Sequence, residues 1–415
     1  MLSRRDFLRQ SVTVVTAGMA MPPIFTQAIH LAHNENLALP KPGERMLLIV
    51  QMAGGNDGLN TIVPFTDPAY YDQRKGLSLT EKEVLPLDDQ FAFHPALAAL
   101  KPLWDKGVMS VVHGVGYPNP NLSHFRSMEI WQTGKPAEPK QVGWLGRYFD
   151  HMTDHEGHLI EGLAVGATLP DAFASNMSPI PAVQSLDAYR LQHDPGDAKD
   201  MGLRAEALLE LYHHYRGASP YAALLDGIAA GAVSSSVALR DIAAAYQPAV
   251  DYPTSNIAKG LMLTAQVLTS DLGVRVAHVG QGGYDTHSNQ KPDQGRLLKE
   301  LAEGLAAFYQ DLEAHGVADK VVIMTWSEFG RRVSDNASAG TDHGTAGPMF
   351  LLGGQVRGGH IGEPVSLSNL DRGNRKYTTD FRSVYATVLD DWLGAPADDI
   401  IGTAMPRLPL LTGVA

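Results

Sequence analysis

The chain has no cysteine among its 415 residues. This absence excludes disulfide bonds, thiolate zinc sites, iron–sulfur clusters and a cysteine nucleophile. It leaves the compartment open, because an oxidising space permits disulfides without requiring them. A metal ion would therefore have to be bound by histidine, aspartate and glutamate side chains.

Positive charge is also scarce. The chain has 33 Lys and Arg against 45 Asp and Glu, which gives a formal net charge of -12. Proteins that bind nucleic acid or anionic membranes normally present a basic surface, so we expect neither partner. With 44% hydrophobic residues, 19% charged residues, 41 glycines and 26 prolines, a coiled coil or a disordered polyelectrolyte is excluded. We expect a globular, loop-rich protein.

Long hydrophobic runs are missing. Residues 11–25 (SVTVVTAGMAMPPIF) are moderately apolar but too short to span a bilayer. They follow Arg4 and Arg5, and SRRDFLRQ resembles the twin-arginine export signal. We predict a twin-arginine signal peptide over residues 1–28, a linker over 29–44, and a periplasmic or secreted protein without a transmembrane anchor after cleavage. The alternative is a cytoplasmic basic amphipathic helix.

Short apolar runs alternate with helical patterns along the rest of the chain. Runs typical of buried strands occupy residues 46–52, 107–115, 159–166, 274–280, 320–330 and 347–354. Helical patterns at 94–107, 123–134 and 294–316 separate several of them. This alternation predicts an α/β fold with a largely parallel sheet, in which ligands gather at the carboxyl ends of strands. The Ala- and Leu-rich segment at about 197–259 has no strand signal and is predicted to be a helical insertion.

Two glycine-rich clusters follow predicted strands and contain aspartate. GGNDGLN holds Asn56 and Asp57, and its glycines would place Asp57 at an open edge of the sheet. An Asx turn that caps the next element is an equal alternative. GGYDTHSNQ holds Asp285 and His287, whose carboxylate and imidazole could face one ion together.

Two further clusters contain histidine. In GTDHGTAGP, Asp342 and His343 are adjacent, so in an extended backbone each could approach a different one of two ions. In RGGHIG, His360 lies among glycines, although an isolated histidine is more often an ordinary surface or core residue. The pair His213 and His214 has a helical context without glycine turns, and we expect it at the surface.

Two other segments could meet an anion. Ser123 is predicted to cap a helix that continues with His124, and a helix N-terminus favours negative groups. In WSEFGRRVSDN, Glu328, Arg331 and Arg332 follow a buried strand, and the two arginines could hold an oxyanion. A simple cap and a salt-bridged helix start are the alternatives.

Taken together, GGNDGLN, NLSHFRSMEIWQTG, GGYDTHSNQ, SEFGRRVSDN and GTDHG resemble the bacterial "domain of unknown function 1501" family, over about residues 45–411. That family is placed near the alkaline phosphatase and sulfatase superfamily. The resemblance implies a three-layer α/β sandwich over 45–411 with a largely parallel central sheet, and one or two divalent metal ions (zinc, calcium or magnesium) at the strand ends.

The resemblance also implies roles for particular residues. Ser123 would stand where the superfamily has its nucleophile, with His124 as a neighbouring candidate and Arg331 or Arg332 stabilising developing charge. The sulfatase Cys-x-Pro-Ser-Arg signature is missing, so a cysteine-derived formylglycine is excluded. The two implied metal sites are Asp57 (or Asn56) with Asp342 and His343, and Asp285 with His287 and His360.

The function implied is an exported metal-dependent hydrolase that acts on phosphate or sulfate esters of a small molecule or polymer. The alternative is a catalytically inert exported binding or assembly protein of the same fold. Members of the family are often encoded beside proteins of the "domain of unknown function 1800" family, which implies a partner protein.

Overall fold

The computed structural model describes residues 45–412, apart from 139–141, 153–159, 177, 179, 186–198, 271 and many residues between 216 and 243. The predicted signal peptide and linker lie outside the described residues. The described chain forms two compact units, a larger one (45–141, 248–265 and 278–415) and a smaller one (142–247 and 266–277). No helix of the described part is long and apolar enough to cross a membrane.

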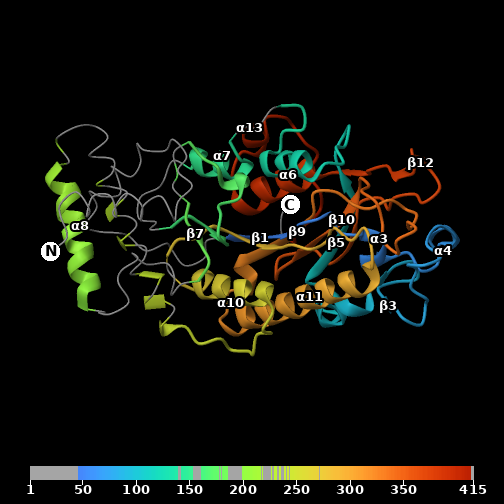
Figure 1. The fold of residues 1–415 in the computed structure, drawn as a ribbon, viewed down its shortest axis with the longest axis horizontal. Coiled ribbons are helices and arrows are strands. Elements are labelled where there is room, and N and C mark those ends of the chain that lie inside the picture. The colour runs from blue at the N-terminus through green and yellow to red at the C-terminus, as the bar shows by residue number, and fades with distance from the viewer. Residues whose placement is uncertain are drawn as a thin grey trace. The chain divides into compact units, whose positions relative to one another are not determined.

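The larger unit is built on a mixed sheet (Figure 1) with strands in the order β11, β5, β10, β9, β1, β8. These strands are β1 (Met46–Met52), β5 (Met109–Gly116), β8 (Val276–Gln281), β9 (Val321–Trp326), β10 (Gly347–Leu352) and β11 (Gly359–Ile361). β1 pairs parallel with β9, while β11 and β14 (Thr379–Asp380) pair parallel with β5. Only β10, among the pairings defined for these strands, runs antiparallel to its neighbours. The predicted α/β class with a largely parallel sheet is confirmed.

The continuous apolar runs of β1 and β5 are explained by burial on both faces of the sheet. Every residue of MLLIVQM and of MSVVHGVG is buried. Such strands read as unbroken hydrophobic runs because helices cover both sides. Figure 1 shows α11 on one side of the sheet and α6 and α13 on the other.

Two small sheets and a set of helices complete the larger unit. The small sheets are β2 (Ile62–Val63) with β4 (Ala92–Phe93) and β3 (Leu85–Pro86), and β12 (Leu370–Asp371) with β13 (Asn374–Arg375). The α-helices are α3 (Gly58–Thr61), α4 (Pro68–Gln73), α5 (Lys101–Asp105), α6 (His124–Thr133), α10 (Asn256–Leu268), α11 (Gln290–Ala314), α12 (Phe381–Thr387) and α13 (Ala397–Ile401). The shorter turns are η1 (Pro95–Leu100), η4 (Ala318–Lys320) and the π-helical η5 (Val388–Leu393).

Aromatic stacking fixes α6 on the sheet. The ring of Trp131 in α6 stacks on Trp326 of β9, with centroids 5.4 Å apart, and on Phe381 of α12 at 4.5 Å. The hydroxyl of Tyr385 in α12 donates to the Trp131 carbonyl oxygen over 3.1 Å. The start of α6 is therefore held at a defined place beside the end of β9.

The smaller unit contains α7 (Trp144–His151), β6 (Gly162–Val165), η2 (Asp171–Phe173), β7 (Ala182–Val183) and α8 (Lys199–Tyr215). β6 and β7 pair in parallel. α8 lies within the predicted helical insertion, much of which is outside the described residues. His213 and His214 of α8 are exposed, as expected from the sequence.

Candidate metal centre

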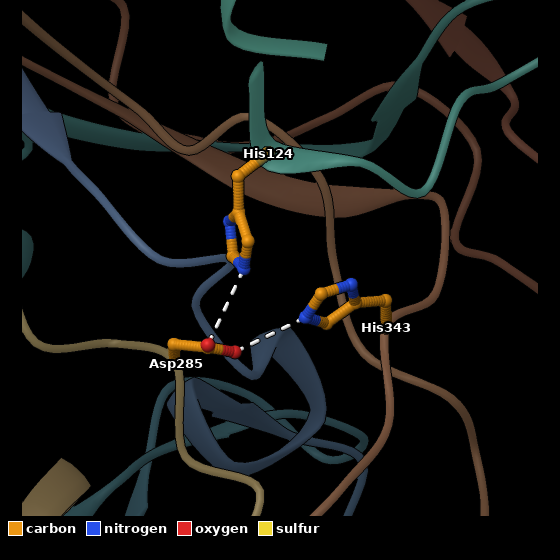
Figure 2. A group of neighbouring side chains, drawn as sticks. All are labelled: His124, Asp285 and His343. Atoms are coloured by element: carbon orange, nitrogen blue, oxygen red, sulfur yellow. Dashed lines mark hydrogen bonds and ion pairs between the residues drawn. The ribbon is translucent and has the colours of Figure 1, made fainter. Parts of the chain in front are cut away.

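Three side chains from separate parts of the larger unit point toward one another (Figure 2): His124, Asp285 and His343. His124 is the first residue of α6, Asp285 follows β8, and His343 precedes β10. The Nε2 atom of His343 lies 3.1 Å from Oδ1 of Asp285, and Nε2 of His124 lies 3.4 Å from Oδ2. One ligand atom from each of the three lies within 4.8 Å of the other two, so together they could hold a metal ion.

A third histidine joins this group. The Nε2 atom of His287 lies 2.9 Å from Nε2 of His343 and 3.1 Å from Oδ1 of Asp285. The Asp-x-His pair of GGYDTHSNQ therefore does present a carboxylate and an imidazole to one point. The structure also places His343 at that point, whereas the sequence had assigned His343 and Asp285 to different sites.

The far nitrogen of two of the imidazoles faces a hydrogen-bond acceptor. Nδ1 of His124 lies 2.7 Å from Oε1 of the buried Glu328, and Nδ1 of His343 lies 2.7 Å from the Leu122 carbonyl oxygen. Because a carboxylate and a carbonyl only accept, each Nδ1 donates a proton. The lone pair of each Nε2 is then turned toward Asp285, the arrangement that orients histidines on metals.

The third histidine repeats this pattern more loosely. Nδ1 of His287 lies 3.4 Å from Oδ1 of Asp342. Asn336 donates from Nδ2 to Oδ1 of Asp342 over 3.3 Å and to the His287 carbonyl oxygen over 2.9 Å. The hydrogen bond from Asn336 and the contact with His287 lower the pKa of the Asp342 carboxyl, against the effect of partial burial. Asp342 therefore contacts His287 on the side of its ring that faces away from Asp285.

Arg331 holds Asp285 in place. Its guanidinium is fully buried, and Nη2 donates to Oδ1 of Asp285 over 2.7 Å. Partial burial raises the pKa of Asp285, but the hydrogen bond from Arg331 and the charge of Arg331 outweigh it and lower the pKa to about 2. The same Nη2 also faces the carbonyl oxygens of Gly54 and Tyr284, while Nε donates to Gly55 and Nη1 to Thr341. We therefore assign Arg331 a positioning role in place of the expected contact with an oxyanion.

Arg332 differs from its neighbour because its side chain is only half-buried. Its Nε has no hydrogen-bond partner among the described residues, and its charge helps to lower the pKa of Asp342 after the larger effects of Asn336 and His287.

Asp57 belongs to a separate buried network. Its side chain is fully buried and pairs with both terminal nitrogens of Arg74, with Nη2 donating to Oδ1 over 2.9 Å. Gln290 donates to the same carboxylate, and the Leu59 N–H donates over 3.2 Å, so that Asp57 caps α3. Burial raises the pKa of Asp57, but the charge and hydrogen bonds of Arg74 outweigh it. These partners take up the carboxylate oxygens, so the Asx-cap alternative describes Asp57 better than the ligand role.

Asn56 and His360 are also held elsewhere. Nδ2 of Asn56 donates to Oγ1 of Thr61 over 2.9 Å, and its Oδ1 accepts from Gln294 over 3.2 Å. His360 lies on β11, where its Nδ1 is 2.8 Å from Nε2 of His113 on β5. Neither side chain is in the group around Asp285, because each is engaged within its own part of the sheet.

Ser123, the candidate nucleophile, and Ser127, another hydroxyl residue of the same segment, have different surroundings. Ser123 is the exposed N-cap residue, and its hydroxyl makes no capping hydrogen bond. Ser127 is buried and donates to the Glu328 carbonyl oxygen. Ser123 therefore stays a candidate, and the imidazole of His124 lies in the group that could hold a metal ion.

The sequence did not reveal that Glu328 and the Leu122 carbonyl accept hydrogen bonds from His124 and His343. Glu328 was noted only as an acidic residue after a buried strand, yet it orients His124 and also accepts from the Gly54 N–H over 2.9 Å. A buried strand that ends in Ser-Glu-Phe-Gly was the available signal. The Leu122 contact uses a backbone carbonyl, so no side-chain pattern could have revealed it.

The chain belongs to the family described as "Protein of unknown function (DUF1501)", whose model matches residues 108–391. No curated protein matches the chain.

Among solved structures, the chain is similar to a protein in the alkaline phosphatase superfamily from Vibrio parahaemolyticus, with 10% identity, 95% of this chain and 76% of that one covered, and a TM-score of 0.35. It is also similar to the C-terminal periplasmic domain of EcEptC from Escherichia coli (10% identity, 90% and 86% covered, TM-score 0.36). A third is murine ectonucleotide pyrophosphatase/phosphodiesterase 5 (9% identity, 88% and 97% covered, TM-score 0.39). At this level of similarity, the functional argument depends on the side chains themselves.

Proposed function

We propose that this member of the DUF1501 family is an exported, metal-dependent hydrolase of phosphate or sulfate esters. One observation carries the proposal: the Nε2 atoms of His124, His343 and His287 converge on the Asp285 carboxylate. Lone pairs and a carboxylate repel one another unless a proton or a metal cation lies between them. The donor set therefore supports a cation at the centre of the group.

The distances fit a first-row metal. Zinc binds imidazole nitrogen at about 2.0–2.1 Å, so neighbouring ligands in a tetrahedral site lie about 3.3 Å apart. Four contacts within the group measure 2.9 to 3.4 Å, and the ligand atoms of His124, Asp285 and His343 all lie within 4.8 Å of one another. Nε2 of His124 is a buried atom without a hydrogen-bond partner among the described residues, as expected for an atom that binds a metal. Two imidazoles and one carboxylate, with the His287 imidazole beside them, favour zinc over calcium or magnesium, which prefer oxygen ligands.

Chemistry at this centre would divide between the metal and the chain. When bound, the metal would polarise an ester oxygen and lower the pKa of an attacking hydroxyl. The exposed hydroxyl of Ser123, next to His124, is the proposed nucleophile. Arg332 would stabilise the developing negative charge of the phosphate or sulfate group, and Arg331 would hold Asp285 ionised and in place.

The test is metal analysis followed by an ester screen. The purified protein, folded with zinc available, should retain stoichiometric metal and hydrolyse p-nitrophenyl phosphate, bis-p-nitrophenyl phosphate or p-nitrophenyl sulfate. His343→Ala should abolish both properties, whereas His213→Ala, at a side chain 71% exposed, should change neither. A wild-type protein without metal under any condition would favour the inert binding or assembly protein. Metal without hydrolysis would keep the centre and reject the ester hydrolase.

Export is a separate part of the proposal and depends on Arg4 and Arg5. The twin-arginine pathway reads the arginine pair itself, so exchange of both for lysine should leave folded precursor in the cytoplasm. Unchanged export would reject this signal. A partner of the "domain of unknown function 1800" family stays a prediction, to be tested by co-purification from the periplasm.

A further inference from the structure

The larger unit also contains a pocket whose lining includes none of the residues around Asp285. It has a volume of about 200 Å³ and lies among α3, the loop after β2, β5, the start of β10 and residues 364–367. A single water needs only about 10–15 Å³ of such space, so the pocket has room for a small organic molecule. About half of its wall is apolar, and this part includes Leu59, Ile62, Pro64, Phe91, Val365 and Leu367.

One buried cation lines this pocket. Arg375 on β13 is 3% exposed, and within the described part of the chain its guanidinium makes one hydrogen bond, a long one of 3.4 Å from Nη2 to the Arg331 carbonyl oxygen. Its Nε has no hydrogen-bond partner among the described residues. Burial lowers the pKa of Arg375 to about 10, which still leaves it charged at neutral pH. A buried guanidinium with so few partners is costly unless a water or an anion meets it.

The nearest carboxylate does not neutralise Arg375. Asp57 acts on it through charge, but the carboxylate oxygens are already occupied by Arg74, Gln290 and the Leu59 N–H. Two buried guanidinium groups thus share one carboxylate. One positive charge is therefore left without its own carboxylate, and Arg375, which carries it, lines the pocket.

The other polar groups of the lining limit the charge of the occupant. His113 is buried and its Nε2 is 2.8 Å from His360, while burial and the nearby His360 lower the pKa of His113 to about 4. It is therefore neutral at neutral pH. Asp67 is half-buried and caps α4 by accepting from the Ala69 N–H over 2.9 Å. One cation with a carboxylate at the rim suits a monoanion and disfavours a dianion such as phosphate.

We propose that this pocket binds a small organic monoanion, a carboxylate with a short hydrocarbon body, with its charged end on Arg375 and its body against the apolar wall. Arg binds carboxylates through paired N–H donors, and Leu59, Phe91 and Leu367 supply an apolar surface. The proposal is independent of the hydrolase function, because the pocket and the group around Asp285 share no residue.

Calorimetric titration of the full chain with sodium butyrate tests the proposal. Butyrate should bind with a stoichiometry of one, and butyramide, butylamine and inorganic phosphate should each bind at least tenfold more weakly. Failure of butyrate to bind would mean that water alone meets Arg375 and would overturn the proposal. Tighter binding of phosphate or butylamine would overturn the assignment of a monoanion.

Two variants locate the site. Val365→Trp fills the pocket without changing its charge and should abolish butyrate binding, while Arg375→Gln removes the cation and should weaken binding at least tenfold. Lys376→Gln, at the neighbouring exposed lysine, is the control and should bind as wild type does. If Arg375→Gln fails to fold, Val365→Trp still shows whether butyrate binds in this pocket. Butyrate binding that survives in a folded Val365→Trp protein would overturn the site.

Discussion

Asp57 and Asp285 are the same kind of residue at equivalent places in the sheet, yet their surroundings are opposite. Each follows a glycine turn at the end of a strand, and the two strands, β1 and β8, are neighbours. The Asp57 side chain is fully buried against Arg74, whereas that of Asp285 is 46% exposed and faces three histidines. A strand-end aspartate is therefore not a ligand by position alone. The side chains that reach it decide whether it stabilises the fold or binds an ion.

The two sites also differ in what their charges can contribute. A buried ion pair loses most of its solvation, so removal of one partner leaves an uncompensated charge and is strongly destabilising. The half-exposed carboxylate of Asp285 keeps part of its hydration, so its ion pair with Arg331 adds less to stability, and the remaining water can be exchanged for a metal ion. Substitutions at the two sites should separate these roles.

The largest effect on stability is expected for Asp57→Asn. The substitution removes the charge that compensates Arg74, and the unfolding free energy should fall by about 3–5 kcal/mol. Asp285→Asn, measured without metal, also removes a carboxylate from a buried guanidinium, that of Arg331, but it should cost less, because Asp285 is half-exposed and Arg331 keeps its backbone carbonyl partners. Urea unfolding of both variants in the presence of a chelator makes the comparison. Equal losses would show that the two carboxylates do not differ in this way.

The next effect concerns metal retention. His343→Ala removes one of the imidazoles that face Asp285, and the affinity for zinc should fall by at least about 100-fold, the upper end of the loss typical for residues that only support a ligand. Competition with a chromogenic chelator measures this. His213→Ala, in the smaller unit, should retain wild-type affinity. Full metal occupancy in the His343 variant would show that the metal does not bind at the group around Asp285.

Glu328→Gln tests the support of His124 without removing a ligand. Glutamine keeps an acceptor for the Gly54 N–H but loses the negative charge beside Nδ1 of His124. Zinc affinity should fall by about 10–100-fold, with far-ultraviolet circular dichroism unchanged. An unaltered affinity would mean that His124 is held by packing against its neighbours and not by this carboxylate.

The region around Asp57 should also give the protein a characteristic response to acid. His94 is buried nearby, and burial lowers its pKa from 6.5 to about 4, although the charge of Asp57 opposes this shift. Between pH 6.5 and 4 the unfolded chain therefore binds a proton that the folded chain does not, and this residue alone should cost about 1.4 kcal/mol per pH unit. Urea unfolding of wild type and His94→Gln at pH 7, 6 and 5 should show a shallower pH dependence in the variant. If the unfolding free energies of wild type and variant fall equally with pH, His94 is not the source of the acid response.

The sequence allowed most of the sheet to be predicted, because strands buried on both faces leave unbroken apolar runs. The run at 46–52 matches β1 (Met46–Met52), and 347–354 contains β10 (Gly347–Leu352). The reversed direction of β10 could not be predicted, since a buried strand reads the same in parallel and antiparallel pairing.

The sequence indicated which residues could form the candidate site, but not which of them lie together, because their partners are distant along the chain. Glycine, aspartate and histidine clusters marked Asp285, His287 and His343, because such residues are uncommon together at the end of an apolar strand. The separation of Asp57 from them depends on Arg74 and Gln290, which lie 17 and 233 residues away along the chain. Neither residue carries a local signal of this pairing. Long-range partners of this kind appear only when the fold brings them together.

Asp342→Asn should produce the smallest effect and so sharpens the boundary of the metal centre. The Asp342 side chain is 56% exposed and touches the group only through Nδ1 of His287, at 3.4 Å. Water screens a carboxylate this exposed, and the amide oxygen of asparagine can still accept from His287. Zinc affinity should therefore fall by less than about tenfold, below the range for well-ordered supporting residues. The same competition assay, run beside Glu328→Gln, measures the difference. A loss as large as that of His343→Ala would place Asp342 among the ligands and make the centre a site for two ions.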